Sequence, residues 1–268
     1  MRNKFALILI GILFSTSPLF LSACQLGDYI YTEDGAIECG ADGDPIILDN
    51  NPEGVNPTFD RLMAFLNADT TDTNSYIDDV YVCADFSEDV HNNAEAAGIR
   101  AGWVGIKFEN MESGHALNVF ETTDRGLVYI DCTNGASLDP ENGGKGWDMV
   151  AYVEEGQRYG VIHVDDILAS GFDYYPLQYR YYADREAAWV EYSAALEQYN
   201  AEVRSYNEEI SGKTFIIGSP EYREITQWEL EILQSEKTLK KYKAEYGSNW
   251  YESEYSSYTV TEILIHWD

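Results

Sequence analysis

Apolar residues along this chain of 268 residues follow two periods, one typical of helices and one typical of strands. Between positions 84 and 97 they recur every three or four residues, which is the period of one face of an α-helix, and Gly98 follows as a usual helix end. Three apolar runs come next, at 99–108, 115–121 and 127–132, and turn-like residues separate them. This order predicts a helix followed by consecutive antiparallel strands.

Shorter patterns on either side complete the predicted core. A helical pattern begins after Pro57, and short strand candidates at 151–153 and 159–164 close the sheet. The last segment, 258–267, is apolar on both faces, so we expect it to return to the core and to lie inside the sheet or under a helix. Together these elements predict an α+β fold class.

The stretch 174–257 differs from the rest, because apolar and aromatic residues step along it by three and four. Two such seams occur, the first at Trp189, Tyr192, Leu196, Tyr199, Val203, Tyr206 and Ile210, and the second at Ile225, Trp228, Ile232, Ser235, Leu239, Tyr242 and Tyr246. The pattern predicts a long antiparallel helical hairpin of coiled-coil type, inserted before a C-terminal strand. The hairpin either packs only against itself, or it forms an arm that recognises a partner or covers a site in the core.

Three residues with chemistry of their own fall on the predicted helix and strands: Cys83, His115 and Asp131. Cys83 stands at the start of the helix, where unpaired amide groups and the helix dipole favour a thiolate. An odd number of residues in the loop between the two strands would place His115 and Asp131 on one face of the sheet. An imidazole can accept a thiol proton, and a carboxylate beside it can hold the ring and stabilise its charge. The three residues therefore form a candidate catalytic site.

These residues and their surroundings resemble the transglutaminase-like superfamily over 58–150. The matching stretches are Cys83 with the following ADF and AEAAGIRAG, His115 within GHALNVF, and Asp131 within LVYIDCT. The resemblance implies a papain-like core with Cys83 as nucleophile, His115 as general base and Asp131 as orienting carboxylate. It also implies hydrolysis or acyl transfer at the amide or peptide bonds of a protein or peptide substrate. The superfamily contains members that keep the fold without the chemistry, so the alternative is an inactive envelope lipoprotein whose helical arm binds a protein partner.

Acyl transfer creates a negatively charged oxygen that needs hydrogen-bond donors. We expect one donor at the backbone amide of Cys83 and a second from the link that precedes it. Asn74, Tyr76 and Tyr81 are the candidates, and each of them can equally serve a turn or the packing of the core.

The N-terminus has the parts of a secretory signal. Basic residues precede an apolar run at 5–14, and the four residues ending in Cys24 (LSAC) resemble a bacterial lipobox, in which Cys24 is lipidated. Polar residues at 15–18 interrupt the apolar run well short of the roughly 20 residues that a membrane span needs. We therefore expect a lipid-anchored protein of the cell envelope, outside the cytoplasm.

Charge narrows the choice of partners. The chain has 17 Lys and Arg against 47 Asp and Glu, which gives a formal net charge of −30. Such a charge argues against nucleic acid as a partner and would repel anionic lipid surfaces.

Cys39, Cys83 and Cys132 remain once the lipidation site is set aside. In an oxidising compartment two of them can pair, and the disulfide that leaves the proposed nucleophile free joins Cys39 to Cys132. Alternatively, Cys132 faces the buried side of its strand. The sequence contains no CxxC pair and no HExxH motif, either of which would indicate a metal site, and we expect no cofactor.

The predicted organisation has five parts. They are a lipoprotein signal peptide at 1–23, an acidic tether at 24–57 that can add an edge strand, a transglutaminase-like core at 58–173, the helical hairpin at 174–257, and a returning strand at 258–268.

Overall fold

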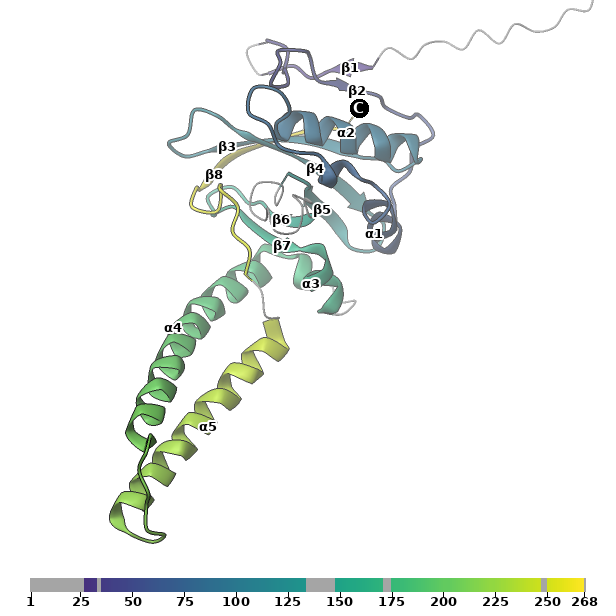
Figure 1. Cartoon of the computed structure of the whole chain (residues 1–268). Helices are drawn as coiled ribbons and strands as arrows, with labels where there is room; N and C mark the ends of the chain where they lie inside the picture. Colours follow the sequence, from purple (N-terminus) through teal and green to yellow (C-terminus); the bar gives the residue numbers. More distant parts are fainter. Residues whose placement is uncertain (1–26, 33–34, 134–147, 171–174, 247–249, 268) are drawn as a thin grey trace, which may run out of the picture.

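A six-stranded antiparallel sheet lies at the centre of the computed structural model, which describes residues 27–32, 35–133, 148–170, 175–246 and 250–267 (Figure 1). Across the sheet the strands follow the order β7 (Gly160–His163), β6 (Met149–Tyr152), β5 (Gly126–Asp131), β4 (His115–Thr122), β3 (Gly102–Phe108) and β8 (Val260–His266). The α+β class with an antiparallel sheet is confirmed, and each predicted strand is found within a few residues of its expected bounds.

The C-terminal strand returns to the core but does not lie inside the sheet. β8 pairs with β3 and stands at one end of the strand order, and residues 262–267 are only partly buried, so this part of the prediction is wrong. The sheet curls near the start of β8, so that this strand meets the segment that leads into β7. There Val260 N donates to Gln157 O at 2.8 Å, and Tyr159 N donates to Tyr258 O at 3.1 Å. These bonds join the two ends of the sheet at this point.

Helix α2 (Cys83–Ala96) packs across one face of the sheet (Figure 1). Phe86, Val90 and Ala94 are fully buried and belong to the same apolar cluster as Phe120 and Ile130 of the sheet. The helix begins where Asp85 accepts a hydrogen bond from Val82 N at 2.8 Å. It ends before Gly98, which has a φ of +71°, a value that glycine adopts without strain. The predicted helix is therefore confirmed.

Shorter helices border this cluster. α1 (Phe59–Leu66) begins at Thr58, whose side chain accepts a hydrogen bond from Arg61 N at 3.2 Å, as its helical pattern predicts. α3 (Val164–Ala169) follows β7, and two single-turn 3₁₀ helices lie at Thr71–Thr73 and Tyr175–Leu177.

The described part of the predicted tether packs against the core rather than hanging free. It carries a two-stranded sheet of β1 (Asp28–Tyr29) and β2 (Ile47–Leu48). Ile46 and Leu48 are buried in one cluster with Trp103. Ile47 N donates to a Glu88 carboxylate oxygen on α2 at 3.0 Å. The short apolar run at 46–48 explains why the segment packs against the core, because burying these side chains removes apolar surface from water.

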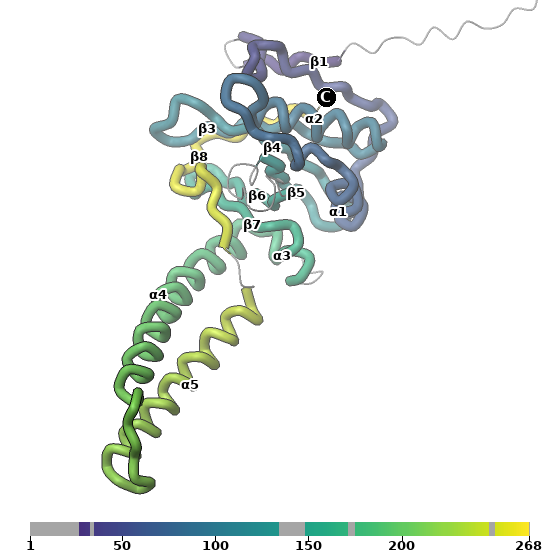
Figure 2. The backbone as a smooth tube through the Cα atoms, in the orientation of Figure 1, coloured from purple at the N-terminus to yellow at the C-terminus, as the bar shows by residue number. Residues whose placement is uncertain are grey.

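The two long helices α4 (Tyr179–Ile210) and α5 (Pro220–Tyr246) form an arm that projects from the core, away from α2 (Figures 1 and 2). They are antiparallel, and their seams meet as predicted: the rings of Tyr192 and Tyr242 stack at 4.3 Å, and Tyr206 meets Trp228 edge-on at 5.6 Å. Two helices cannot enclose such a seam fully, and of its members only Tyr192 and Leu239 are buried.

The predicted membrane anchor cannot be compared with the structure in the same way as the core and the arm. Within the described residues no helix is long and apolar enough to cross a membrane. The predicted signal sequence and Cys24 lie outside the described residues.

Candidate active site

Cys83 is the first residue of α2, as its place before the helical pattern predicts. Its side chain is half-buried, and its thiol is free. The backbone N–H groups of a first helical turn have no preceding carbonyl within the helix, so they can bind a negatively charged group. The fold thus brings together a thiol and unpaired backbone donors.

His115 and Asp131 meet on the sheet. His115 is the first residue of β4 and Asp131 the last of β5, and His115 Nε2 lies 2.9 Å from Asp131 Oδ2. Both side chains are buried, at 0% and 1% exposure. The loop between the paired residues Thr122 and Gly126 has three residues, an odd number, so the two side chains share a face as neighbours across the strands.

Burial and charge act against each other on this pair. Burial alone lowers the pKa of His115, but the Asp131 carboxylate reverses that effect and, with a smaller contribution from Cys83, raises the pKa of His115 to about 10. Burial likewise raises the pKa of Asp131, whereas the charge of His115 and hydrogen bonds from His115, Thr133 and Tyr159 leave it below its usual value. At neutral pH the pair is therefore an imidazolium and a carboxylate.

Two residues that the sequence did not single out complete the surroundings of Asp131. The Tyr159 hydroxyl donates to Oδ2 at 2.6 Å, and Thr133 donates to Oδ1 from its backbone N at 3.0 Å and from its hydroxyl at 2.5 Å. Thr133 is close in sequence, but nothing in the sequence distinguishes Tyr159 from the other 20 tyrosines of the 21 in the chain. The carboxylate is held by four donors, counting His115, and this fixes its orientation.

The second ring nitrogen of His115, Nδ1, is buried and has no hydrogen-bond partner within the described part of the chain. The Cys83 thiol does not meet hydrogen-bond geometry with it, yet it lies close enough to contribute to the raised pKa of His115. Since Nε2 is occupied by Asp131, Nδ1 is the ring nitrogen that remains for a further hydrogen bond.

A cleft of about 440 Å³ opens beside Cys83 and His115. Its other walls come from β3, the β3–β4 loop, β8 and the N-terminal segment, with Trp103, Met111 and Leu264 among the apolar residues. None of the described residues that line it belongs to the arm. The described part of the arm thus does not line the cleft, whereas the segment predicted to be a tether forms one of its walls.

Gly114 explains how the chain enters the site. A Cβ atom at this position would come within 2.5 Å of the Ile106 carbonyl oxygen on β3. Only a residue without a side chain can pass so close to the neighbouring strand, and His115 follows immediately.

Of the candidate donors in the preceding link, two are committed elsewhere. Asn74 donates to the Tyr81 hydroxyl at 2.9 Å, and Tyr81 in turn donates to Asp89 on α2. Tyr76 stacks on Phe86, and its pKa is raised to about 12 by burial first and by the nearby Cys83 second. Tyr76 is therefore the one of these three residues that lies close enough to the Cys83 thiol for the thiol to affect its pKa.

The expected disulfide between Cys39 and Cys132 is absent, since both cysteines are free. Cys132 is buried in the apolar cluster beneath α2, on the opposite face of β5 from Asp131, which is the alternative considered above. Cys39 is exposed and lines the cleft that contains Cys83. Side chains of neighbouring strand residues point to opposite faces, so Cys132 points away from the face that carries Asp131. Cys132 is therefore directed into the apolar cluster and not toward the cleft that Cys39 lines.

In the part of the chain that the structure describes, no group of three His, Cys, Asp or Glu side chains is placed to hold a metal ion. Comparison of the chain with protein-family models, with curated proteins and with solved structures finds no match.

Proposed function

We propose that the protein is a cysteine acyl-enzyme that acts on amide or peptide bonds of a protein or peptide substrate. The observation that carries the proposal is the buried His115–Asp131 pair at 2.9 Å, with its free ring nitrogen toward a free thiol at a helix start. The cleft beside the thiol is within the usual volume range of small-ligand sites. The sequence resemblance to transglutaminase-like proteins supports the same roles for the three residues.

The reaction follows from these positions. The Cys83 thiolate attacks the carbonyl carbon, and the developing oxyanion is stabilised by N–H groups of the first turn of α2. His115 gives its proton to the leaving amine, and the carbon–nitrogen bond breaks to leave a thioester on Cys83. Water or another amine then attacks the thioester, gives a proton to His115, and releases the thiolate. Asp131 holds the ring and stabilises its charge throughout.

The place of action is part of the proposal. Lipidation of Cys24 would anchor the protein at the cell envelope, outside the cytoplasm. The chain is strongly acidic, with a formal net charge of −30 over the full sequence, and this favours a protein or peptide substrate over nucleic acid.

A thiol-directed acyl probe tests the chemistry. On the full-length chain we expect rapid labelling of Cys83, with the labelled peptide identified by mass spectrometry so that Cys39 is counted separately. Cys83→Ala abolishes this labelling, and His115→Gln slows it, because the thiolate loses the imidazolium that stabilises its charge. Labelling of Cys83 at the rate of a simple thiol, unchanged in His115→Gln, would contradict the proposal.

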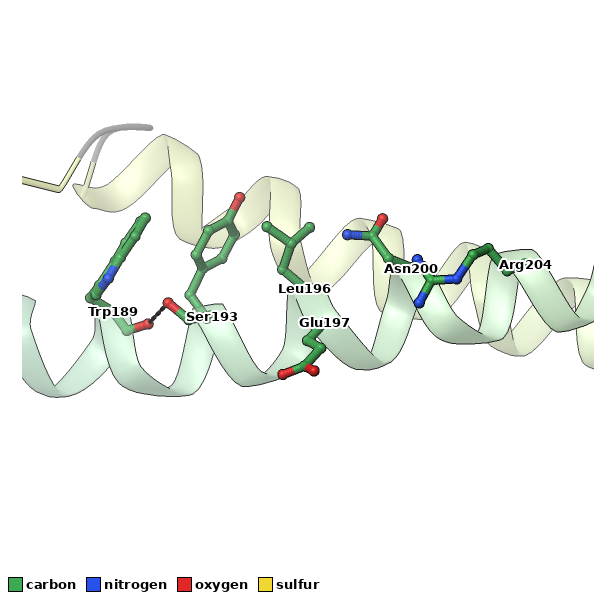
Figure 3. A pocket seen from close by; sticks show the side chains of 7 residues that line it. Trp189, Ser193, Leu196, Glu197, Asn200 and Arg204 are labelled. Atoms are coloured by element: carbon green, nitrogen blue, oxygen red, sulfur yellow. Dashed lines mark hydrogen bonds between the residues drawn. The ribbon is translucent and has the colours of Figure 1, made fainter. Parts of the chain in front are cut away.

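A second candidate function is partner binding by the arm, with or without catalysis in the core. The arm has a hollow of about 310 Å³, lined by Trp189, Tyr192, Ser193, Leu196, Glu197, Asn200 and Arg204. Figure 3 shows Trp189 and Leu196 pointing toward α5 and Glu197 pointing away from it. At the tip, Ile216 and Ile217 are 78% and 83% exposed. Contiguous exposed apolar patches mark interaction sites, and the hollow and the tip of the arm are the candidates for such a site.

Photo-crosslinking tests the second candidate. A photoreactive residue at Leu196 should capture a partner protein, whereas one at Val190, which is 65% exposed on the same helix and does not line the hollow, is the matched control. Equal capture from both positions, or none from either, would count against a partner in this hollow.

A further inference from the structure

The ring of Tyr255 lies against the ring of His115. Their centroids are 4.2 Å apart and the planes are 25° from parallel, while Tyr159 meets the same imidazole edge-on at 5.6 Å. Tyr255 is buried, with 7% of its surface exposed. The imidazole therefore has Asp131 at one nitrogen and aromatic rings against its face and its edge.

Local structure holds the Tyr255 ring in this place. It stacks on Phe108 of β3, with centroids 5.3 Å apart and planes 6° from parallel. Its backbone N donates to the Ser253 hydroxyl at 3.2 Å, and its carbonyl accepts from Tyr258 N at 2.9 Å, so a tight turn precedes β8. A ring fixed by its own turn and by a neighbouring strand has little freedom to leave the imidazole.

The segment that carries Tyr255 begins at the base of the arm. Trp250 stacks on Trp189 of α4 at 5.8 Å with planes 10° apart, and on Tyr182 at 5.8 Å with planes 25° apart. Only four residues separate Trp250 from Tyr255. A shift of α4 at its base therefore pulls on a short chain whose other end rests on His115.

We propose that Tyr255 is a positioning residue for His115, whose ring holds the imidazole against Asp131 and keeps water from the pair. The segment from Trp250 to Tyr255 couples this role to the arm. The inference rests on the proposed function, because it assigns a role and a means of regulation to the same site. An aromatic face attracts a cation lying over it, and this attraction grows when water is excluded. The Coulomb attraction between imidazolium and carboxylate also grows as the local dielectric falls. A partner bound to the arm would thus change the reactivity of Cys83 without touching the cleft.

The test measures the rate of Cys83 alkylation by iodoacetamide as a function of pH, on the full chain, with the site resolved by mass spectrometry. Removing the ring in Tyr255→Leu should slow alkylation at pH 6.5 by about tenfold and move the profile toward that of an ordinary thiol, near pH 8.5. Tyr255→Phe keeps the ring and should recover most of the wild-type rate. A loss in Tyr255→Phe as large as in Tyr255→Leu would assign the effect to the hydroxyl and overturn the proposal.

The arm supplies a matched pair of variants that leave the core intact. Trp189→Ala removes the ring on which Trp250 stacks, and it should slow alkylation at pH 6.5 by about threefold in the same direction. Tyr206→Ala removes an aromatic contact far out on the arm, with Trp228, and should leave the profile unchanged. Identical profiles for the two arm variants would overturn the coupling, and this pair decides the matter if Tyr255→Leu does not fold.

The two proposals fail in different ways. If wild-type Cys83 reacts as an ordinary thiol and His115→Gln has no effect, the proposed function falls and this inference falls with it. If wild-type Cys83 reacts at low pH in a manner that needs His115, but Tyr255→Leu behaves as wild type, the proposed function stands and only this inference is lost.

Discussion

The sheet core and the helical arm are both rich in aromatic side chains, but they place them around different things. In the core, Tyr159 and Tyr255 are buried around a charged pair, and the Tyr159 hydroxyl is committed to a carboxylate. In the arm, Trp189 and Tyr242 are half-buried, and they stack on Trp250 and Tyr192, respectively. The core aromatics thus surround a single ion pair, whereas the arm aromatics form a series of similar ring-to-ring contacts.

This difference teaches where a single substitution should matter most. A buried ion pair is costly to break, because the remaining charge stays in a medium that cannot solvate it. A seam of stacked rings divides its stabilisation among many members, and most of its side chains are also partly solvated. We expect a steep response in the core and a graded one in the arm.

The largest effect is expected for Asp131→Asn. The change leaves His115 without its counter-charge in a fully buried site, and it should lower the free energy of unfolding by about 3–5 kcal/mol. Urea denaturation followed by circular dichroism measures the loss. Asp165→Asn, at a side chain that is 83% exposed, is the control and should be nearly silent. Similar losses for the two variants would mean that the core pair does not differ from a surface charge.

The pH dependence of stability has a definite sign for this pair. The pKa of His115 is raised from 6.5 to about 10, so its contribution is fully present below about pH 6.5 and is lost as the pH rises to about 10. The pKa of Asp131 is lowered from 3.8, so its contribution is present above pH 3.8 and is lost as the pH falls through the lowered value. The stability difference between wild type and His115→Gln should therefore shrink between pH 6.5 and 10. A constant difference over that range would contradict a charged pair.

A smaller effect is expected in the arm from Leu239→Ala. Leu239 is among the few buried seam residues, and its truncation should cost about 2 kcal/mol, mostly in the arm. Hydrogen exchange of α4 and α5 should speed up while exchange of β4 and β5 stays unchanged. Leu233→Ala, at a leucine of α5 that is 52% exposed, is the matched control. Faster exchange in both the arm and the sheet would show that the two regions unfold as one unit.

An effect of similar size on stability is expected for Gly114→Ala. The added Cβ would lie within 2.5 Å of the Ile106 carbonyl, so the start of β4 must shift, at a cost of about 1–3 kcal/mol. Because His115 follows directly, Cys83 alkylation at pH 6.5 should slow more than the loss of stability alone suggests. A stable variant with an unchanged alkylation profile would show that the strand can move without disturbing the site.

Local periodicity determined much of this molecule from the sequence alone. The helical period before Gly98 placed Cys83 at a helix start, and the repeated three-and-four steps defined the hairpin. The separation of His115 and Asp131 predicted a shared face, on a condition that the three-residue loop meets. These features depend on neighbours in the chain, which a pattern reports directly.

Tertiary structure alone decided which distant residues complete the site. Tyr159 reaches Asp131 from the position just before β7, Tyr255 reaches His115 from beyond the whole arm, and Cys39 comes to the cleft on a segment expected to be a tether. A pattern shows which face of an element is buried but not what covers it, because that depends on the path of the chain and on the curl of the sheet. For the same reason β8 lies at the end of the strand order although its sequence is apolar on both faces.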